Sequence, residues 1–192
     1  MNGRQKSWKV VVVMLLLVIL AVGGFLWLRG REDAEKGKES MTEVEKLLVH
    51  DLESNYPGNA REVIRFYNRL MKCFYNEELT EEELKGLADQ ARILFDVELL
   101  RRNPLDQYVE NLETEILLYK EMQRTIINVA LQDYDEVRFE TKGEDEIASL
   151  LSYYLMKEGT NSISTYLRYY LREDEDGKWR ILFWEMSEEK FE

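Results

Sequence analysis

The longest uncharged run of this chain spans residues 10–28 and limits what that segment can form. It holds nineteen consecutive residues without Asp, Glu, Lys or Arg, between Lys9 and Arg29. As a helix rising about 1.5 Å per residue, it reaches roughly 28 Å, close to the ~30 Å hydrocarbon core of a bilayer. Trp8 and Trp27 fall at its two ends, where indole side chains favour the headgroup region. The run predicts a transmembrane helix.

The charges around this span bear on its orientation. Three basic residues precede it and two follow at once, so the positive-inside count is nearly balanced. A short basic tail stays in the cytoplasm easily, whereas a long domain crosses the membrane largely regardless of charge. We therefore predict a single-pass protein of the cell membrane with its N-terminus inside. Its parts are a cytoplasmic tail (1–9), a transmembrane anchor (10–28), a charged linker (29–40) and an extracytoplasmic domain (41–192).

A cleaved signal peptide is the competing interpretation of the same segment. Ala21-Val22-Gly23 satisfies the small-x-small pattern of a cleavage site, and residues 10–20 would pass as an apolar core. Against cleavage, apolar residues resume at 25–28 and are followed by Arg29 and Arg31, as expected for an uncleaved anchor. We favour the anchor.

Charge and composition exclude several classes of function. No Asp or Glu precedes Glu32, and from there on 38 acidic residues stand against 21 basic ones, a net charge of −17. Such a domain repels nucleic-acid backbones and anionic headgroups, so we predict no nucleic-acid partner and a domain that does not lie flat on the membrane. His50 and Cys73 are the only histidine and cysteine, and no phosphate loop or metal-ligand spacing occurs. We predict no cofactor and no metal.

Hydrophobic periodicity predicts helices first and strands afterwards. Capping pairs at Thr42/Glu45, Asn59/Glu62 and Thr80/Glu83 indicate three helix starts, with the third helix continuing to Asn103 and a fourth helix after Asp106. After about residue 125 the period changes from 3.6 to 2. Asp176-Gly177 is a strong hairpin signal. We predict an α+β domain, in which a helical half packs on a curved antiparallel sheet of about four strands in a cone-like arrangement.

Four blocks of sequence carry a resemblance to a known family. They are residues 51–57, which end in Asn55-Tyr56-Pro57, residues 61–68, residues 73–78 (Cys-Phe-Tyr-Asn-Glu-Glu), and residues 177–181 followed by Trp184-Glu185. With the single N-terminal span, they resemble membrane-anchored bacterial proteins classed only as a domain of unknown function. More loosely, helices packed as a cone against a curved sheet are similar to the nuclear transport factor 2-like (SnoaL-like) superfold. That superfold implies little about function, because it hosts enzymes, dimerisation domains and scaffolds alike.

Aromatic and arginine side chains recur at even positions of three successive predicted strands. If these positions share one face of the sheet, that face has the composition enriched at protein interfaces. Internal packing beneath the helices, or lining of a ligand pocket, are the alternatives. The residues of this candidate interaction face are Tyr154, Tyr166, Arg168, Tyr170, Arg180, Leu182 and Trp184.

Two classes of function remain. The first is a membrane-tethered binding or assembly module without catalytic activity, which associates with itself or another protein through the candidate face. The alternative is a small-molecule binder or a lyase/isomerase that uses the interior of the cone, toward which Tyr67, Tyr119, Tyr153 and Tyr169 would point. No catalytic triad occurs, and inward tyrosines are usually core residues with a satisfied hydroxyl. We therefore expect the binding module.

Overall fold

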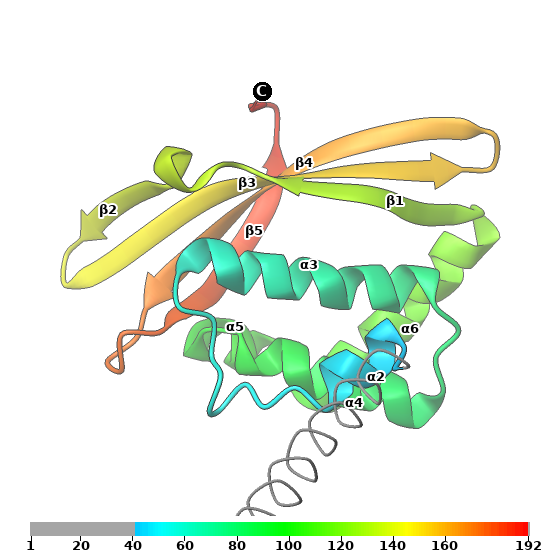
Figure 1. The fold of residues 1–192 in the computed structure, drawn as a ribbon, viewed down its shortest axis with the longest axis horizontal. Coiled ribbons are helices and arrows are strands. Elements are labelled where there is room, and N and C mark those ends of the chain that lie inside the picture. The colour runs from blue at the N-terminus through cyan, green and yellow to red at the C-terminus, as the bar shows by residue number, and fades with distance from the viewer. Residues whose placement is uncertain (1–40, 192) are drawn as a thin grey trace, which may run out of the picture. The chain divides into compact units, whose positions relative to one another are not determined.

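The computed structural model describes residues 41–191, which form one compact unit from Glu43 onward. This unit is an α+β domain whose helices lie on one side of an open antiparallel sheet (Figure 1). The predicted tail, anchor and linker lie outside the described residues. Within the described part, no helix is both long and apolar enough to cross a membrane.

Local capping starts the helices where the sequence predicts. The Asn59 side chain accepts a hydrogen bond from the Glu62 backbone N–H at 2.9 Å, and Thr80 and Glu83 form a reciprocal capping box. These two of the three predicted caps are confirmed. The helices are α2 (Glu43–Leu48), α3 (Ala60–Asn76), α4 (Glu81–Ile93), α5 (Val97–Arg102) and α6 (Leu105–Glu121).

The predicted third helix is wrong in extent, because it breaks between α4 and α5. The Leu94 carbonyl and the Asp96 backbone N–H each form a 2.8 Å hydrogen bond with the backbone of Ile181. The Asp96 side chain then caps α5 by accepting from the Glu98 N–H at 2.8 Å. The chain leaves the helix here because its backbone groups pair with a sheet edge, a long-range contact that helical periodicity does not report.

The sheet has five strands where about four were predicted. They are β1 (Arg124–Leu131), β2 (Arg138–Lys142), β3 (Asp145–Glu158), β4 (Asn161–Glu173) and β5 (Trp179–Ser187). The order is β1-β3-β4-β5, with β2 on the same edge of β3 as β1. The missed strand is β1, whose alternation is interrupted by an irregularity between Ile126 and Asn128. A short 3₁₀ turn, η1 (Tyr134–Glu136), separates β1 from β2.

The core lies between the helices and one face of the sheet. Helix α3 supplies Tyr67 and Phe74, and strands β3 and β4 supply Leu150, Tyr169 and Leu171, all at most 2% exposed. The opposite face of the sheet carries no described α-helix (Figure 1), and the last residues reach it, with Glu189 paired to Arg168 and the Phe191 ring 5.5 Å from that of Tyr166. We call these two faces the inner face and the outer face.

Candidate functional site

The strand register divides the candidate interaction face between the two sides of the sheet. In the β3–β4 hairpin Glu158 pairs with Asn161, and this register continues to Tyr153 opposite Tyr166. Paired residues point to the same face, and their numbers differ in parity. An even position on β3 therefore faces away from an even position on β4. The prediction that all seven residues share one face is wrong.

Tyr154 and Trp184 belong to the inner face. Tyr154 is only 3% exposed, and its hydroxyl bonds to Tyr169 Oη at 2.7 Å and to Asn68 Oδ1. The Trp184 ring lies 5.8 Å from that of Tyr67 and 6.0 Å from that of Tyr169. These two residues pack toward α3 and the core, although Trp184 keeps 37% of its surface exposed.

Tyr166, Arg168 and Tyr170 do lie together, on the outer face. The Tyr170 ring stacks on Phe183 at 4.4 Å, and its hydroxyl donates to Glu185 at 3.0 Å. Burial and the bond to Glu185 raise the pKa of Tyr170. We define the outer-face patch as the residues of this cluster with their register partners: Tyr153, Tyr166, Arg168, Tyr170, Phe183 and Glu185.

Arg168 is the centre of this patch and is nearly inaccessible. It pairs with Leu151 on one neighbouring strand, β3, and with Glu185 on the other, β5, and is 6% exposed. Its Nη2 pairs with Glu189, whose other carboxylate oxygen pairs with Arg138. Its Nη1 is buried and has no hydrogen-bond partner among the described residues. A buried donor left in this way costs about 1–3 kcal/mol, and more when it is charged.

Leu182 and Arg180 mark the end of the patch. Tyr170 pairs with Phe183 and Leu171 pairs with Ile181, so Leu182 is the extra residue of a bulge. Arg180 turns away from the patch, donates to Asp174 at 2.7 Å and lies over the Tyr56 ring at 4.5 Å.

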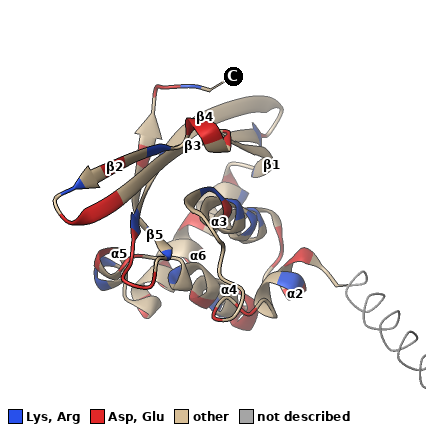
Figure 2. Ribbon diagram, turned by 60° about the vertical axis from the view of Figure 1, so that its left-hand side comes forward, with Lys and Arg blue, Asp and Glu red and all other residues tan. Residues whose placement is uncertain are grey.

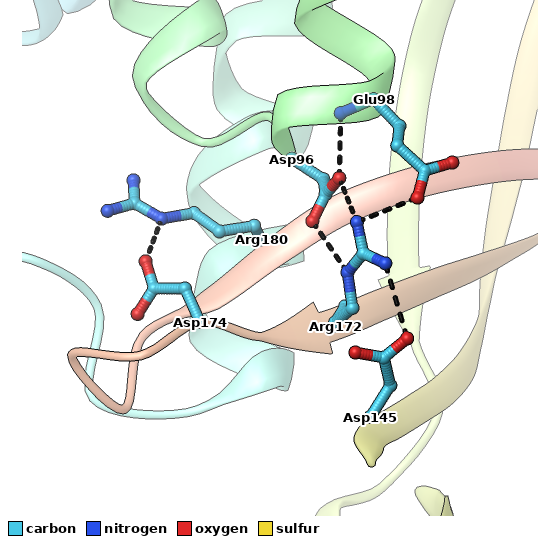
Figure 3. Close-up of polar contacts among 6 residues, drawn as sticks. All are labelled: Asp96, Glu98, Asp145, Arg172, Asp174 and Arg180. Carbon is cyan, nitrogen blue, oxygen red and sulfur yellow. Dashed lines mark hydrogen bonds and ion pairs between the residues drawn. The ribbon is translucent and has the colours of Figure 1, made fainter. Parts of the chain in front are cut away.

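A cluster of charges fixes the neighbouring corner of the fold. The Arg172 guanidinium pairs with Asp96 at 2.6 Å and Glu98 at 3.0 Å on one side, and with Asp145 at 3.3 Å on the other (Figure 3). These bonds join β3, β4 and the start of α5. Since every acid in the cluster contacts the same guanidinium, the cluster stabilises the fold rather than presenting a free charge.

A cleft lies beside this corner, between Tyr56, the start of α5 and the turn before β5. Its volume is about 630 Å³. One wall is Tyr56, whose hydroxyl donates to the Trp179 carbonyl at 2.8 Å. Lys178 Nζ lies 5.3 Å from the Tyr56 ring, and Val97 and Leu100 add apolar surface. The cleft combines an aromatic wall with side chains of both charges, among them Lys178 and Arg180 together with Glu53, Asp96 and Asp174.

The space between helices and sheet is filled by hydrogen-bonded tyrosines. Tyr67 and Tyr169 are at most 2% exposed, and Asn68 links Tyr154 to Ser152 through a 3.0 Å bond to Ser152 Oγ. Burial raises the pKa of Tyr154 to about 12, and raises those of Tyr67 and Tyr169 well above 10.0. These phenols therefore stay neutral near pH 7. Of the other two predicted inward tyrosines, Tyr119 contacts the core and Tyr153 lies on the outer face.

His50 and Cys73, the remaining residues with reactive side chains, both pack against other parts of the fold. The His50 ring lies 4.9 Å from Phe66 and faces the Asn55 carbonyl at 3.4 Å. Cys73 is 2% exposed, and burial raises the pKa of its thiol to about 11. Within residues 41–191, no group of three or more His, Cys, Asp or Glu side chains could hold a metal ion.

Sequence comparisons identify the family and do not extend to a characterised relative. No curated protein matches the chain. The profile of a domain of unknown function, DUF6715, matches residues 1–184, and the chain belongs to this family.

Proposed function

We propose that this protein is a membrane-tethered, extracytoplasmic assembly module without catalytic activity. Residues 10–28 would hold it in the cell membrane, and the domain would self-associate through the outer-face patch. The two-layer arrangement supports a likeness to the nuclear transport factor 2-like superfold. That likeness alone transfers no activity, so the proposal depends on the patch.

The observation that carries the proposal is the state of Arg168. Its side chain is nine-tenths buried at the centre of an aromatic face that no described α-helix covers, and its Nη1 has no acceptor among residues 41–191. Most buried polar groups of folded proteins are hydrogen-bonded. Because Nη1 is itself buried, a partner's carboxylate or carbonyl would reach it only where Glu189 and Phe191 move aside, and the partner would then cover Tyr166, Tyr170 and Phe183. Aromatic residues and arginine are the anchors most often found at interface centres.

The charges of the face favour a second copy as that partner. A two-fold interface joins the same surface on both chains, so each cation must meet an anion of the same surface. The outer face carries Arg138 and Arg168 together with Glu185 and Glu189. In a two-fold dimer, the arginines of one copy can therefore pair with the glutamates of the other copy. A purely basic or purely acidic face would repel its own copy.

The tyrosines between the helices and the sheet support the part of the proposal that assigns the domain no catalytic activity. General acid–base groups work best with a pKa near the operating pH. Burial raises the pKa values of the interior phenols of Tyr67, Tyr154 and Tyr169, which moves them further from a neutral operating pH. They also pack against one another, with the Tyr67 and Tyr169 rings 6.0 Å apart. This filled interior favours the assembly module over an enzyme of the same architecture.

Two substitutions on one strand test the proposal. Phe183 is 43% exposed on the outer face, and Met186 is 83% exposed on the inner side of β5. We expect Phe183→Lys to convert a dimer to a monomer in sedimentation of the detergent-solubilised full-length protein. Met186→Lys, with the same change of charge, should leave the mass unchanged. A monomeric wild type, or equal dissociation by both variants, would contradict self-association through this face.

The cleft beside Tyr56 supports a second candidate function, binding of a small molecule. Ligand sites usually measure about 300–1,000 Å³ and combine apolar walls with a few polar groups, and this cleft of about 630 Å³ does so. Its lining also includes Glu53, Asp96 and Asp174, and Asp174 pairs with Arg180. Lys178, which forms no ion pair within residues 41–191, would bind a carboxylate on a flat ligand stacked on Tyr56. A panel of small aromatic acids should then raise the melting temperature of the wild type but not of Lys178→Met. An unchanged melting temperature with every acid would remove this candidate.

A further inference from the structure

The exposed strip of α3 is basic, although the domain as a whole is acidic. Most of the helix is buried, including Val63, Tyr67, Leu70 and Phe74. The residues left toward solvent include Arg61, Arg65, Arg69 and Lys72, and Glu62 is the single acid of the helix. Spacings of four, four and three residues place these four cations along one side of the helix. Blue segments along α3 mark them in Figure 2.

A groove runs between this strip and β1. Its volume is about 310 Å³. The four cations of α3 line one side, Asn128, Val129 and Leu131 of β1 line the other, and Asn68 contributes from the buried side. No acidic side chain is part of this lining. The strip spans roughly 16 Å along the helix at about 1.5 Å per residue, so several anionic groups could be bound in a row.

Three of the four cations of the groove contact carboxylates at the surface, and Arg61 also donates from Nε to the Gln132 carbonyl at 2.7 Å. Arg65 pairs with Glu62 at 2.7 Å, and Arg69 pairs with Glu43 at 2.7 Å. Arg61 lies 3.8 Å from Asp133, whose side chain is 83% exposed. Lys72 forms no ion pair with a residue of the described part of the chain. Exposed ion pairs of this kind contribute little to stability, so a stronger anion could replace them.

We infer that the groove between α3 and β1 binds a small soluble ligand that carries two or more phosphate groups. A phosphate group has a charge near −2 and three acceptor oxygens, and the arginine fork binds it with two parallel hydrogen bonds. A single carboxylate has no such advantage over Glu43, Glu62 and Asp133, which already contact these arginines. The size of the groove suits a short chain of phosphate groups.

The overall negative charge does not prevent this binding but restricts the ligand. At physiological ionic strength, charges beyond about 8 Å are largely screened, so a short ligand experiences mainly the cations that line the groove. A duplex or an anionic membrane would also meet the acidic surface around the groove and would be repelled. The inference is independent of the outer-face patch, which lies on the other side of the sheet.

Calorimetric titration of the detergent-solubilised full-length protein with tripolyphosphate tests the inference. We expect saturable binding that is at least tenfold weaker in Arg65→Gln/Lys72→Gln. The matched control is Arg101→Gln/Arg102→Gln, which removes the same charge from exposed positions of α5 and should bind as the wild type does. Orthophosphate, with one phosphate group, should bind at least tenfold more weakly than tripolyphosphate.

Several results would overturn the inference. They are the absence of saturable binding, an equal loss in the two double variants, or equal affinity for orthophosphate and tripolyphosphate. Binding to vesicles of anionic phospholipid without binding to tripolyphosphate would assign the groove to headgroups instead, and would also overturn it. Lys72→Gln alone serves as the second variant, because the exposed Lys72 side chain makes no ion pair within residues 41–191, so its loss should leave the fold intact and still weaken the binding of tripolyphosphate.

Discussion

Replacing Trp184 by Ala should destabilise the domain without changing its assembly. The indole packs between Tyr67 and Phe95, with ring centroids 5.8 Å and 6.3 Å away. Truncation of a fully buried Trp or Phe costs about 3–5 kcal/mol. Because Trp184 is 37% exposed, we scale this to a loss of about 2–3 kcal/mol in the free energy of unfolding.

Urea unfolding of the full-length protein, followed by circular dichroism, measures this loss. Sedimentation of the same sample measures the mass. Met186→Ala is the control, because Met186 is 83% exposed two residues further along the strand, and we expect it to cost about 0.5 kcal/mol or less. A Trp184→Ala variant with wild-type stability and a lowered mass would refute the assignment of Trp184 to the inner face.

Three further predictions concern the thiol, the phenols and the anchor. Burial raises the pKa of the Cys73 thiol to about 11, so native protein should leave a maleimide unreacted at pH 7.5, while protein in concentrated urea should consume one equivalent. Burial raises the pKa of Tyr56 and of Tyr154 from 10.0 to about 12. As the pH rises, the unfolded chain therefore loses these protons at a lower pH than the folded protein does. The urea concentration at the midpoint of unfolding should stay constant up to about pH 9 and fall between pH 10 and pH 12. Leu17→Arg should cost about 2.5–3.5 kcal/mol of membrane insertion and release much of the protein on carbonate extraction, whereas recovery of a soluble wild type beginning at Gly24 would show cleavage instead.

The sequence predicted the features of the fold that depend on neighbouring residues. Caps at Asn59 and Thr80 involve atoms within three residues, and the turn predicted at Asp176-Gly177 contains a glycine with a positive φ. The break at Leu94–Asp96 depends instead on hydrogen bonds to Ile181, almost ninety residues away. Such pairing leaves no periodic signal in the helix that it interrupts.

The division of the candidate face was predictable in part. A hairpin in which Glu158 pairs with Asn161 requires Tyr153 to oppose Tyr166, so the hairpin turn alone indicates that even positions change face between β3 and β4. The bulge at Leu182 has no such local signal. Nor does the contact of Glu189 with Arg138 and Arg168, which depends on where the last residues cross the sheet.

Cysteine cross-linking tests the central claim of assembly through the outer face most directly. Cys73 is buried, so a cysteine introduced on β5 is the reactive thiol of the described part of the chain. We compare Phe183→Cys with Met186→Cys in native membranes, using a short bifunctional maleimide. The account predicts a covalent dimer for Phe183→Cys and a monomer for Met186→Cys. A monomer for Phe183→Cys, or equal dimer for both variants, would contradict it.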